Sequence, residues 1–488
     1  MAKLYVFGIG GTGARVIRSL TMLLATGLDL NGYELVPILV DPDLANGDLN
    51  RTVKALESYQ RVREPLEFEH NRFFKTTITP LSGLNPQMAT QLNTHGFNFK
   101  INNSQTTFDQ FIGYTQLNAA NQALINLLYT QENLNTNMDE GFRGNPNMGS
   151  IVLNQFTTSD DFTAFATSFG HNDRIFIISS IFGGTGAAGF PLLLNNIRKP
   201  ASNVPNPQSL RDSVIGALTV LPYYKLNEQT TGTDSKTYVP KAIAALSYYD
   251  RTITTNNYLN AMYYIADPDP VTYSNHAGGE SQLNNAHIVE LAGALAILDF
   301  AQETNKMNPE ANRHTVYREF GITKREQQLT FDNLGPTTQK QLKRALGQFL
   351  YVSEYLRFEA ERAFGLQPAF TSGTRIGREF LTDSFYKEFK AFCHLFDTWL
   401  GELKANQPNL ALFRADTTRD NIFKLINGVE PKPLKKFDEI RRVENFHYFN
   451  QILQEVSDGD ISKWPIIQKF GAAIYRATKE VMHRRFNA

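Results

Sequence analysis

Two glycine-rich turns, far apart in the chain, most constrain how this sequence can fold. The first is "GIGGTG" at residues 8–13, and the second is "FGGTGAAG" at residues 182–189. Each turn follows an apolar run and precedes a helical pattern, so each predicts a passage from strand to helix. Backbone N–H groups of such a turn converge on an anion, and the helix N-terminus adds partial positive charge. We therefore expect a parallel α/β sheet that brings both turns to one edge, where they bind the same polyphosphate.

The spacing of apolar runs predicts the rest of this sheet. Strands are expected at residues 3–7, 33–43, 175–180, 214–221 and 261–265. The helical pattern over residues 14–26 turns Arg15 and Arg18 outward. A nearly unbroken apolar run at about 283–303 predicts a central helix that is buried on most sides.

The two remaining parts of the chain have a different pattern. Residues from about 52 to 140 are rich in Asn, Gln and Thr, which indicates a long, partly helical insertion. Long amphipathic patterns at 337–365, 384–406 and 461–486 predict a mainly helical region near the C-terminus. We therefore expect an α/β domain over residues 1–330 and a mainly helical domain over residues 331–488.

Composition excludes several classes of function. Lys and Arg total 48, as do Asp and Glu, so the net charge is zero and no strong nucleic-acid signal is present. The single cysteine excludes disulfides and Cys-based metal clusters within one chain. No apolar run reaches membrane-spanning length, and a cytoplasmic location is expected.

Two acids at the end of the predicted second strand are candidate ligands at the same edge. Asp41 could lie near the phosphates, and Asp43 could hold Mg²⁺ through water. The alternative for both is the capping of a turn. Farther along, His287-x-x-Glu290 has helical metal-ligand spacing but no third ligand nearby, so core or capping roles are expected.

The order of the turns resembles the tubulin/FtsZ superfamily. In that family a first glycine-rich loop is followed by a loop similar to "GNPNMG" at 144–149 and by a signature similar to "FGGTGAAG". "TVLPYYK" at 219–225 is similar to the loop after the next strand, although Leu221 stands where the family has its ribose-binding Glu. Asn284, in "QLNNAHIVE", stands where the family reads the guanine edge, and capping of a helix is the alternative role.

The resemblance implies a tubulin/FtsZ-like protein that binds GTP or GDP with Mg²⁺. Together with the glycine turns, it predicts this set of nucleotide-binding residues: Gly8, Gly10, Gly11, Thr12, Gly13, Arg15, Asp41, Gly144, Asn145, Gly149, Gly183, Gly184, Thr185, Gly186, Pro222 and Asn284.

The resemblance also implies how hydrolysis would proceed. In the family, a loop N-x-D-x-x-[DE] from the neighbouring protomer positions the attacking water. Asn308 and Glu310 are the nearest match here, with Arg313 in place of the last acid. This implies slow or partner-stimulated GTPase activity and head-to-tail self-association into oligomers or filaments. A second alternative is that the chain binds a protein partner encoded in the same operon.

Three other functions stay open from the residues alone. One is a scaffold that binds nucleotide without hydrolysing it. Another is a ThiF-like adenylating enzyme, because "LVDPDLANGDLNRT" at 39–52 resembles that family, in which Asn50 and Arg51 would touch ATP. The third is a Rossmann oxidoreductase, in which Asp41 or Asp43 would hold a ribose.

Overall fold

We describe a computed structural model of the chain. It describes residues 1–66, 72–87, 96–102, 105–142, 144–226, 237–267, 271–273, 279–303, 314–321, 328–366, 375–406, 409–432 and 446–486.

The centre of the molecule is a parallel sheet, as the sequence predicts, and it has six strands where the sequence indicated five. The strand order is β2-β1-β3-β4-β6-β8. The bounds are β1 Lys3–Ile9, β2 Glu34–Val40, β3 Arg174–Ser180, β4 Val214–Val220, β6 Ala261–Ala266 and β8 Val316–Gly321. The order reverses between β1 and β3, and we call this place the switch point. Open α/β sheets bind ligands at such a point, outside the carboxyl ends of the strands. Two short parallel strands, β5 Tyr224–Leu226 and β7 Val271–Tyr273, pair separately.

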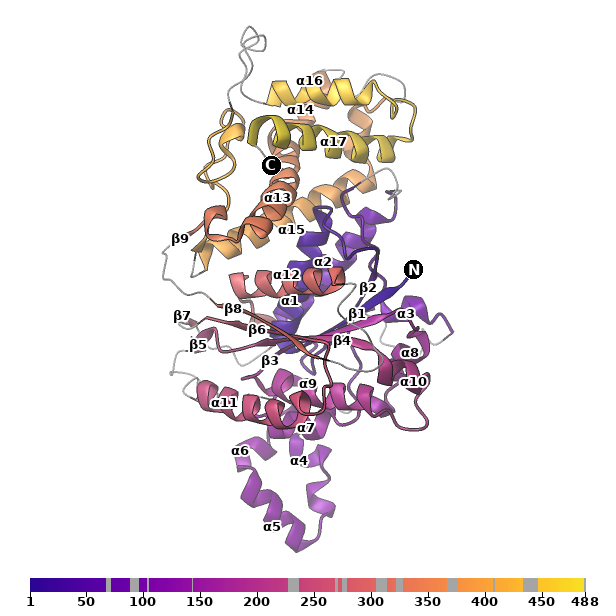
Figure 1. Cartoon of the computed structure of the whole chain (residues 1–488), viewed down its shortest axis with the longest axis vertical. Helices are drawn as coiled ribbons and strands as arrows, with labels where there is room; N and C mark the ends of the chain where they lie inside the picture. The colour runs from indigo at the N-terminus through magenta and orange to yellow at the C-terminus, as the bar shows by residue number, and fades with distance from the viewer. Residues whose placement is uncertain are drawn as a thin grey trace.

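Helices cover both faces of the sheet (Figure 1). One face carries α1 Gly10–Ala25, α2 Gly47–Arg63 and the central helix α12 Ile288–Gln302. The close packing there is visible at Gly293 of α12, where an added Cβ would lie 2.8 Å from Leu218 and 3.1 Å from Val16. The opposite face carries α7 Pro146–Leu153, α8 Asp160–Ser168, α9 Gly184–Arg198, α10 Pro207–Asp212 and α11 Tyr238–Tyr249. Both faces of the sheet are thus closed to water, as its continuous apolar strands require.

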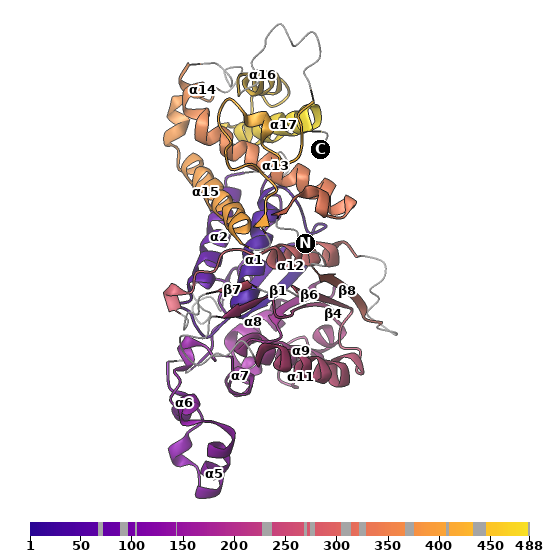
Figure 2. The ribbon, with the colours of Figure 1, turned by 90° about the vertical axis from the view of Figure 1, so that its left-hand side faces the viewer.

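Residues 52–63, at the start of the predicted insertion, belong to α2, which packs on α1. The rest of the predicted insertion has two structural parts. The first includes α3 Leu81–Leu84 and lies along the edge strand, where Leu35 bridges to Ile78 and Leu39 to Asn98. The second, residues 105–142, projects beyond α7 and α11 as a narrow lobe (Figures 1 and 2). This lobe contains α4 Phe108–Phe111, α5 Ala119–Leu128 and α6 Gln131–Leu134.

A helical region lies on the opposite side of the sheet from the lobe (Figures 1 and 2). Its helices are α13 Pro336–Phe358, α14 Ala360–Leu366, α15 Ser384–Ala405, α16 Phe446–Ser457 and α17 Ile466–Phe486, and its short strands β9 Gln328–Leu329 and β10 Asn409–Leu410 pair together. The mainly helical character predicted for this region is confirmed, and the domain boundaries themselves stay predictions. Among the residues described, none of the helices combines the length and apolar character needed to span a bilayer.

The helical region is packed around aromatic side chains and is fixed to the sheet domain. Phe349 of α13 stands edge-on to Phe396 of α15 with ring centroids 4.8 Å apart, a favourable aromatic geometry. Trp399 of α15 is fully buried, and its indole N–H donates to Ser19 Oγ of α1 at 3.2 Å. The sheet domain and the helical region therefore share a continuous core.

One buried and one half-buried carboxyl group in this region predict a pH-dependent stability. Burial raises the pKa of Glu354 on α13 to about 7 and that of Asp397 on α15 to about 6. Because the folded chain binds these protons more tightly than the unfolded chain, stability falls as pH rises from about 4 to about 7. We expect Glu354→Gln to raise the free energy of unfolding by about 1–2 kcal/mol at pH 8 and by a clearly smaller amount at pH 5.

Urea unfolding at the two pH values measures this difference. Glu361→Gln, at a side chain that is 68% exposed, is the control and is expected to have little effect at either pH. A gain for Glu354→Gln that is equal at pH 5 and pH 8 would contradict the assignment.

Candidate functional site

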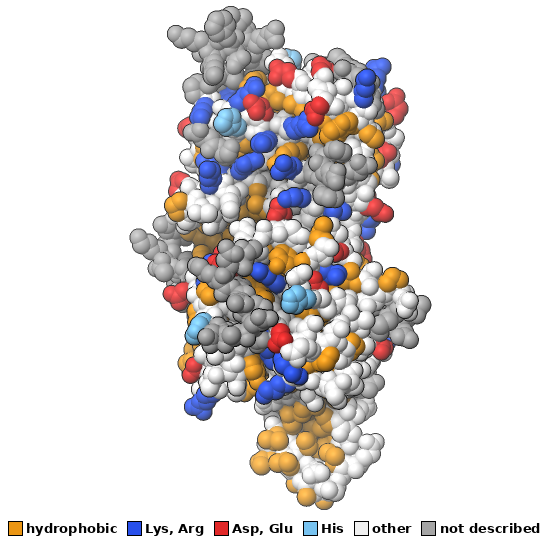
Figure 3. All heavy atoms as spheres, turned by 45° about the vertical axis from the view of Figure 1, so that its right-hand side comes forward, with side chains coloured by type: hydrophobic (Ala, Val, Ile, Leu, Met, Phe, Trp, Pro, Cys, Tyr) orange, Lys and Arg blue, Asp and Glu red, His pale blue; other side chains and the backbone are white. Residues whose placement is uncertain are grey.

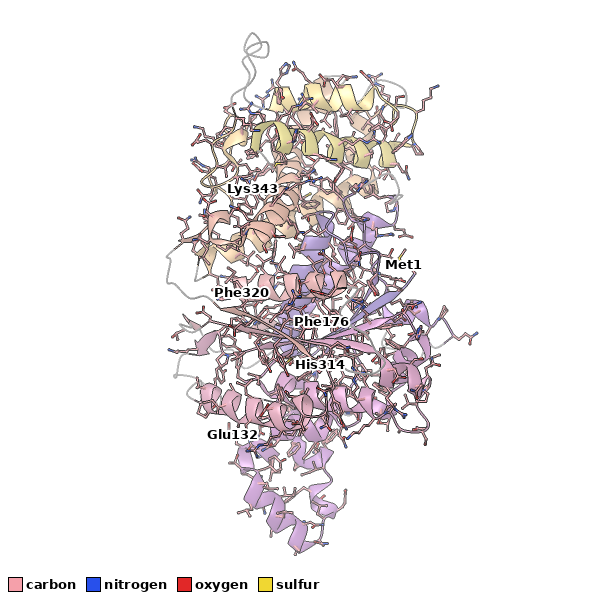
Figure 4. The ribbon with its side chains drawn as sticks, in the orientation of Figure 1. Met1, Glu132, Phe176, His314, Phe320 and Lys343 are labelled. Carbon is pink, nitrogen blue, oxygen red and sulfur yellow. The ribbon has the colours of Figure 1, made fainter. Side chains whose placement is uncertain are left out.

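Three turns meet at the carboxyl edge of the sheet. In Figure 4, Met1, just before β1, marks the side of the sheet where the strands begin, and Phe320, near the end of β8, marks the side where they end. A Cβ added at Gly10, at the start of α1, would lie 3.5 Å from Thr185 Cβ and 3.7 Å from Gly186 N of α9. A Cβ added at Gly184 would lie 3.2 Å from both Gly144 N and Asn145 N. We call residues 10–13, 144–145 and 183–186 the turn cluster.

The first turn depends on glycine at two positions. Gly10 has φ of +73°, a left-handed conformation that residues with a Cβ rarely adopt. At Gly13 an added Cβ would lie 2.5 Å from the carbonyl carbon of Gly8, so α1 approaches β1 closely. The two glycines let the first turn of α1 pack closely against the end of β1.

Two of the helix N-termini in the turn cluster have no side-chain cap. Neither Ile9, before α1, nor Gly183, before α9, accepts a hydrogen bond from the first-turn N–H groups with its side chain. By contrast, the side chain of Asn145 caps α7, since its Oδ1 accepts from Asn147 N at 3.1 Å and Met148 N at 3.4 Å. The first turn of a helix has N–H groups without intrahelical partners, and an anion is a favourable partner for them.

Arg15 of α1 lies next to this cluster, 3.9 Å from a Cβ added at Gly11, and belongs to a buried ionic network. Its Nε donates to Glu290 Oε1 at 2.5 Å, its Nη1 donates to Asp48 Oδ2 at 2.9 Å, and its Nη2 donates to the phenol of Tyr223. Arg15 and Arg18 are only 5% and 4% exposed, so the prediction that they turn outward is wrong. They are buried because acids from distant parts of the chain neutralise them. The predicted contact of Arg15 with a phosphate stays a prediction, since all three guanidinium nitrogens are engaged within the protein.

The network continues into the helical region through alternating charges. Asp48 also pairs with Arg51, which pairs with Glu402 of α15 at 3.0 Å. Glu402 in turn pairs with Arg18 at 2.8 Å and accepts the N–H of Ala286 at 3.0 Å. The turn cluster is therefore connected to α15 by ion pairs.

The two acids beside Arg15 respond differently to burial. Burial raises the pKa of Glu290 above its ordinary value, and the positive charge of Arg15 opposes this only in part. Burial also acts to raise the pKa of Asp48, but Arg15 and Arg51, with hydrogen bonds from Arg51 and Asn284, hold it below its ordinary value. Asp48 is thus the firmly ionised partner of Arg15.

Tyr223 provides a test of this network. Its hydroxyl meets Arg15, lies 3.2 Å from Glu290 Oε1 and hydrogen-bonds the side chain of Thr12 in the turn cluster. We expect Tyr223→Phe to lower the free energy of unfolding by about 2 kcal/mol, because it removes a hydrogen bond to a buried charge. Tyr317→Phe, at a half-exposed phenol bonded to Thr254, is the matched control and is expected to change little. Equal effects of the two variants in denaturant unfolding would contradict this role.

Asp41 and Asp43 both lie beside the second strand and take part in turn bonds. Asp41 Oδ1 accepts the N–H of Asp43 at 3.2 Å, and Asp43 Oδ2 accepts the N–H of Gly279 at 2.8 Å. Burial raises the pKa of Asp41 to about 7 and also raises that of Asp43. In the described part of the chain, no group of three or more His, Cys, Asp or Glu side chains could hold a metal ion. A magnesium ion held by Asp43 would therefore rely on water and phosphate oxygens for its other ligands.

The residues before the central helix are close to the same network. The backbone N–H and the side-chain amide of Asn284 donate to the two oxygens of Asp48 at 3.1 and 2.7 Å. The central helix begins at Ile288 rather than near 283, because His287 and Glu290 form a capping box. The expected capping role of these two residues is confirmed. Pro222 follows β4 at the carboxyl edge of the sheet, and Gly149 of α7 packs near the carbonyl of Gly184.

The predicted catalytic residues cannot be placed. Asn308 and Glu310 lie outside the described residues, so the predicted hydrolytic loop stays a prediction.

The structure also identifies a shared role that the sequence did not indicate. Asp48, Tyr223 and Glu290 surround Arg15, yet they come from α2, the turn after β4 and α12. The sequence indicated Glu290 only for core or capping roles and Tyr223 only as part of a loop, and it did not indicate Asp48. Their common neighbour Arg15 becomes evident only in three dimensions.

Comparison with known proteins gives little further support. No protein-family model matches this chain, and no curated protein matches it. Among solved structures, CetZ from Methanosaeta thermophila strain DSM 6194, a protein of the tubulin/FtsZ family, is similar over 62% of this chain, with 14% identity and a TM-score of 0.24. The match spans about half of that chain, 52% of its length. This likeness is too weak to carry an argument, so the functional conclusion depends on the turn cluster.

Proposed function

We propose that the protein binds a guanine nucleotide at the turn cluster and that the bound nucleotide controls its self-association, with slow or partner-stimulated hydrolysis. The observation that carries the proposal is the convergence of three turns, from the ends of β1 and β3 and the start of α7, at the switch point of a parallel sheet.

A polyphosphate fits this arrangement better than a single phosphate. The first turns of α1 and α9 have no side-chain caps, and the two helices approach each other closely at Gly10 and Thr185. Each of these turns has backbone N–H groups available to a ligand. Successive phosphates of one nucleotide would accept hydrogen bonds from both turns. Mg²⁺ bound to the phosphates would reach Asp43 through water.

The choice of guanine and the assembly behaviour rest on the sequence resemblance. Asn284 is our base-reading residue, and its position would be fixed by Asp48, which accepts its backbone N–H and one N–H of its side-chain amide. An amide held in this way still offers its oxygen to a guanine N–H. Head-to-tail contacts would bring the loop with Asn308 and Glu310 onto the nucleotide of the next protomer. The basic Arg313 in that loop is the reason that we propose slow hydrolysis.

Sedimentation of the full chain tests the proposal. The protein is pelleted with GTP, with ATP and with a non-hydrolysable GTP analogue, while phosphate release is followed in parallel. We expect GTP and the analogue to promote pelleting and ATP to have little effect, with slow phosphate release from GTP. Pelleting without any release would instead favour a nucleotide-gated scaffold. Pyrophosphate exchange with ATP would favour the adenylating enzyme, and neither binding nor release would exclude the proposed function.

A further inference from the structure

The lobe exposes an apolar helix at its tip. Leu127, Leu128 and Leu124 of α5 are 83%, 61% and 53% exposed, and none of the residues of α5 is buried. Hydrophobic side chains gather on the lobe at the bottom of Figure 3. Monomeric proteins rarely hold several leucines together in water, so this face indicates an interaction site.

The charges of the lobe narrow the choice of partner. Residues 101–142 contain no Lys or Arg, and the four acids in this segment are Asp109, Glu132, Asp139 and Glu140. An acidic segment without cations does not complement an anionic membrane surface. A fitting partner has a groove that is apolar and free of acids, with basic groups beside it.

Such a groove lies on this same chain, between α9 and α11. It has a volume of about 630 Å³, and Phe182, Pro191, Leu192 and Ala245 provide much of its apolar lining. Lys199 and Lys241 also line it, and no Asp or Glu is among its described lining residues. Val239 and Ile243 of α11 are 58% and 63% exposed, so apolar surface extends onto that helix.

A second concave area on the described surface fits the lobe less well. It lies between α12, β6, β8 and α13 and has a volume of about 530 Å³. Asp299, Arg318 and Glu319 line it, and Arg318 is paired with Asp299 at 2.7 Å. The remaining charge of this area is negative, like that of the lobe, so the two would repel. The α9–α11 groove is therefore the complementary one.

We propose that the lobe of one copy docks into the α9–α11 groove of a second copy, and that the exchange is reciprocal. The lobe projects from the face of the sheet that carries α7, α9 and α11, and it points away from the molecule (Figures 1 and 2). Because the lobe and the groove lie on the same face, a two-fold axis can place the lobe of each copy in the groove of the other. Such an arrangement gives a closed dimer rather than an open filament. One end of the groove reaches the turn cluster, because Gly183 is among its lining residues. The contacts proposed here are with α9 and α11, and their apolar and basic lining is present without nucleotide.

Cross-linking tests the contact directly. The single native cysteine, Cys393, is buried, so Leu127→Cys and Ala244→Cys each provide one accessible thiol. The two single variants of the full chain are mixed without nucleotide and treated with a short bis-maleimide. We expect a covalent dimer in the mixture and much less in Leu127→Cys alone. Stronger linking in Leu127→Cys alone would show lobe-to-lobe packing and overturn the proposal.

Sedimentation without nucleotide provides the second test. We expect the wild-type chain to dimerise, and a lobe variant (Leu124→Glu with Leu127→Glu) and a groove variant (Lys199→Glu with Ile243→Glu) each to dimerise at least about tenfold more weakly. The mixture of the two variants keeps one of the two contacts, so we expect partial recovery. Ile466→Glu, at a 40% exposed side chain of α17, is the control and leaves the dimer intact. A wild-type monomer at about 100 µM, or no recovery in the mixture, would refute reciprocal docking.

Because these tests omit nucleotide, their failure would leave the proposed GTP site standing. Conversely, we expect the lobe variant (Leu124→Glu with Leu127→Glu) to lose the dimer and to bind GTP as the wild-type chain does.

Discussion

Replacing Gly184 by Val together with Thr185 by Ala is expected to reduce GTP affinity at least about a hundredfold, equivalent to about 2.7 kcal/mol. The Cβ atom of Val at residue 184 would lie 2.9 Å from Phe142 Cβ and 3.2 Å from Gly144 N and Asn145 N. The two turns would have to separate, and the first-turn N–H groups of α9 would no longer face the same point as those of α1. Fluorescence titration with a labelled GTP measures the loss.

A matched pair of substitutions controls for general effects of the same chemistry. Gly401→Val with Thr398→Ala changes the same residue types on α15, where a Cβ added at Gly401 meets nothing within 4 Å. We expect this control to bind GTP as the wild-type chain does. The Gly184 variant is also checked for a native circular dichroism spectrum and thermal midpoint. A native fold with unchanged GTP affinity would exclude the turn cluster as the nucleotide site.

The second large effect is expected from Arg15→Met. Met has a similar length but no charge, so Glu290 loses its cation and Asp48 keeps only Arg51. Removal of one partner from a buried ion pair is strongly destabilising, and we expect a loss of about 3–5 kcal/mol in the free energy of unfolding. Without Arg15, burial raises the pKa of Glu290 further, so the loss is expected to be smaller at pH 5 than at pH 8.

Guanidinium chloride unfolding at the two pH values measures this effect. Arg61→Met is the control, because the Arg61 side chain is 49% exposed and pairs with Glu388 on the surface at 3.0 Å. We expect this control to stay within about 0.5 kcal/mol of the wild-type chain. A loss below about 1 kcal/mol for Arg15→Met would mean that the network contributes little to folding.

Much of the sheet could be predicted from sequence because local patterns determine it. The buried strands predicted at residues 175–180 and 214–221 end within one residue of β3 and β4. Each is a short apolar run that is followed within three residues by a glycine or proline, and such runs fit buried parallel strands. The glycine turns were also local signals, since α1 begins at Gly10 and α9 at Gly184.

Other elements could not be predicted because their local pattern was ambiguous. β8, Val316–Gly321, carries Arg318 and Glu319 and pairs only with β6 at the edge of the sheet, so it lacks the continuous apolar pattern of a central strand. The last helix begins at Ile466 rather than near 461, because Pro465 disfavours helix at the residue before it. The expected helix over 337–365 is interrupted at Glu359, between α13 and α14.

The environment of Arg15 is the clearest case of a feature that sequence could not give. Its partners Asp48 and Glu290 lie 33 and 275 residues away in the chain. An arginine in an amphipathic pattern is expected to face water, and only the docking of α2 and α12 onto α1 reverses this. The lobe is similar, because helical periodicity predicts α5 but not that its apolar side stays uncovered.

The account as a whole depends on one nucleotide being shared by the turn cluster. An experimental structure of the full chain with a non-hydrolysable GTP analogue and Mg²⁺ tests this most directly. We predict that the triphosphate accepts hydrogen bonds from backbone N–H groups within residues 10–13 and within residues 183–186, with the 144–145 turn beside it. A nucleotide bound elsewhere, or contacting only one of these turns, would contradict the account.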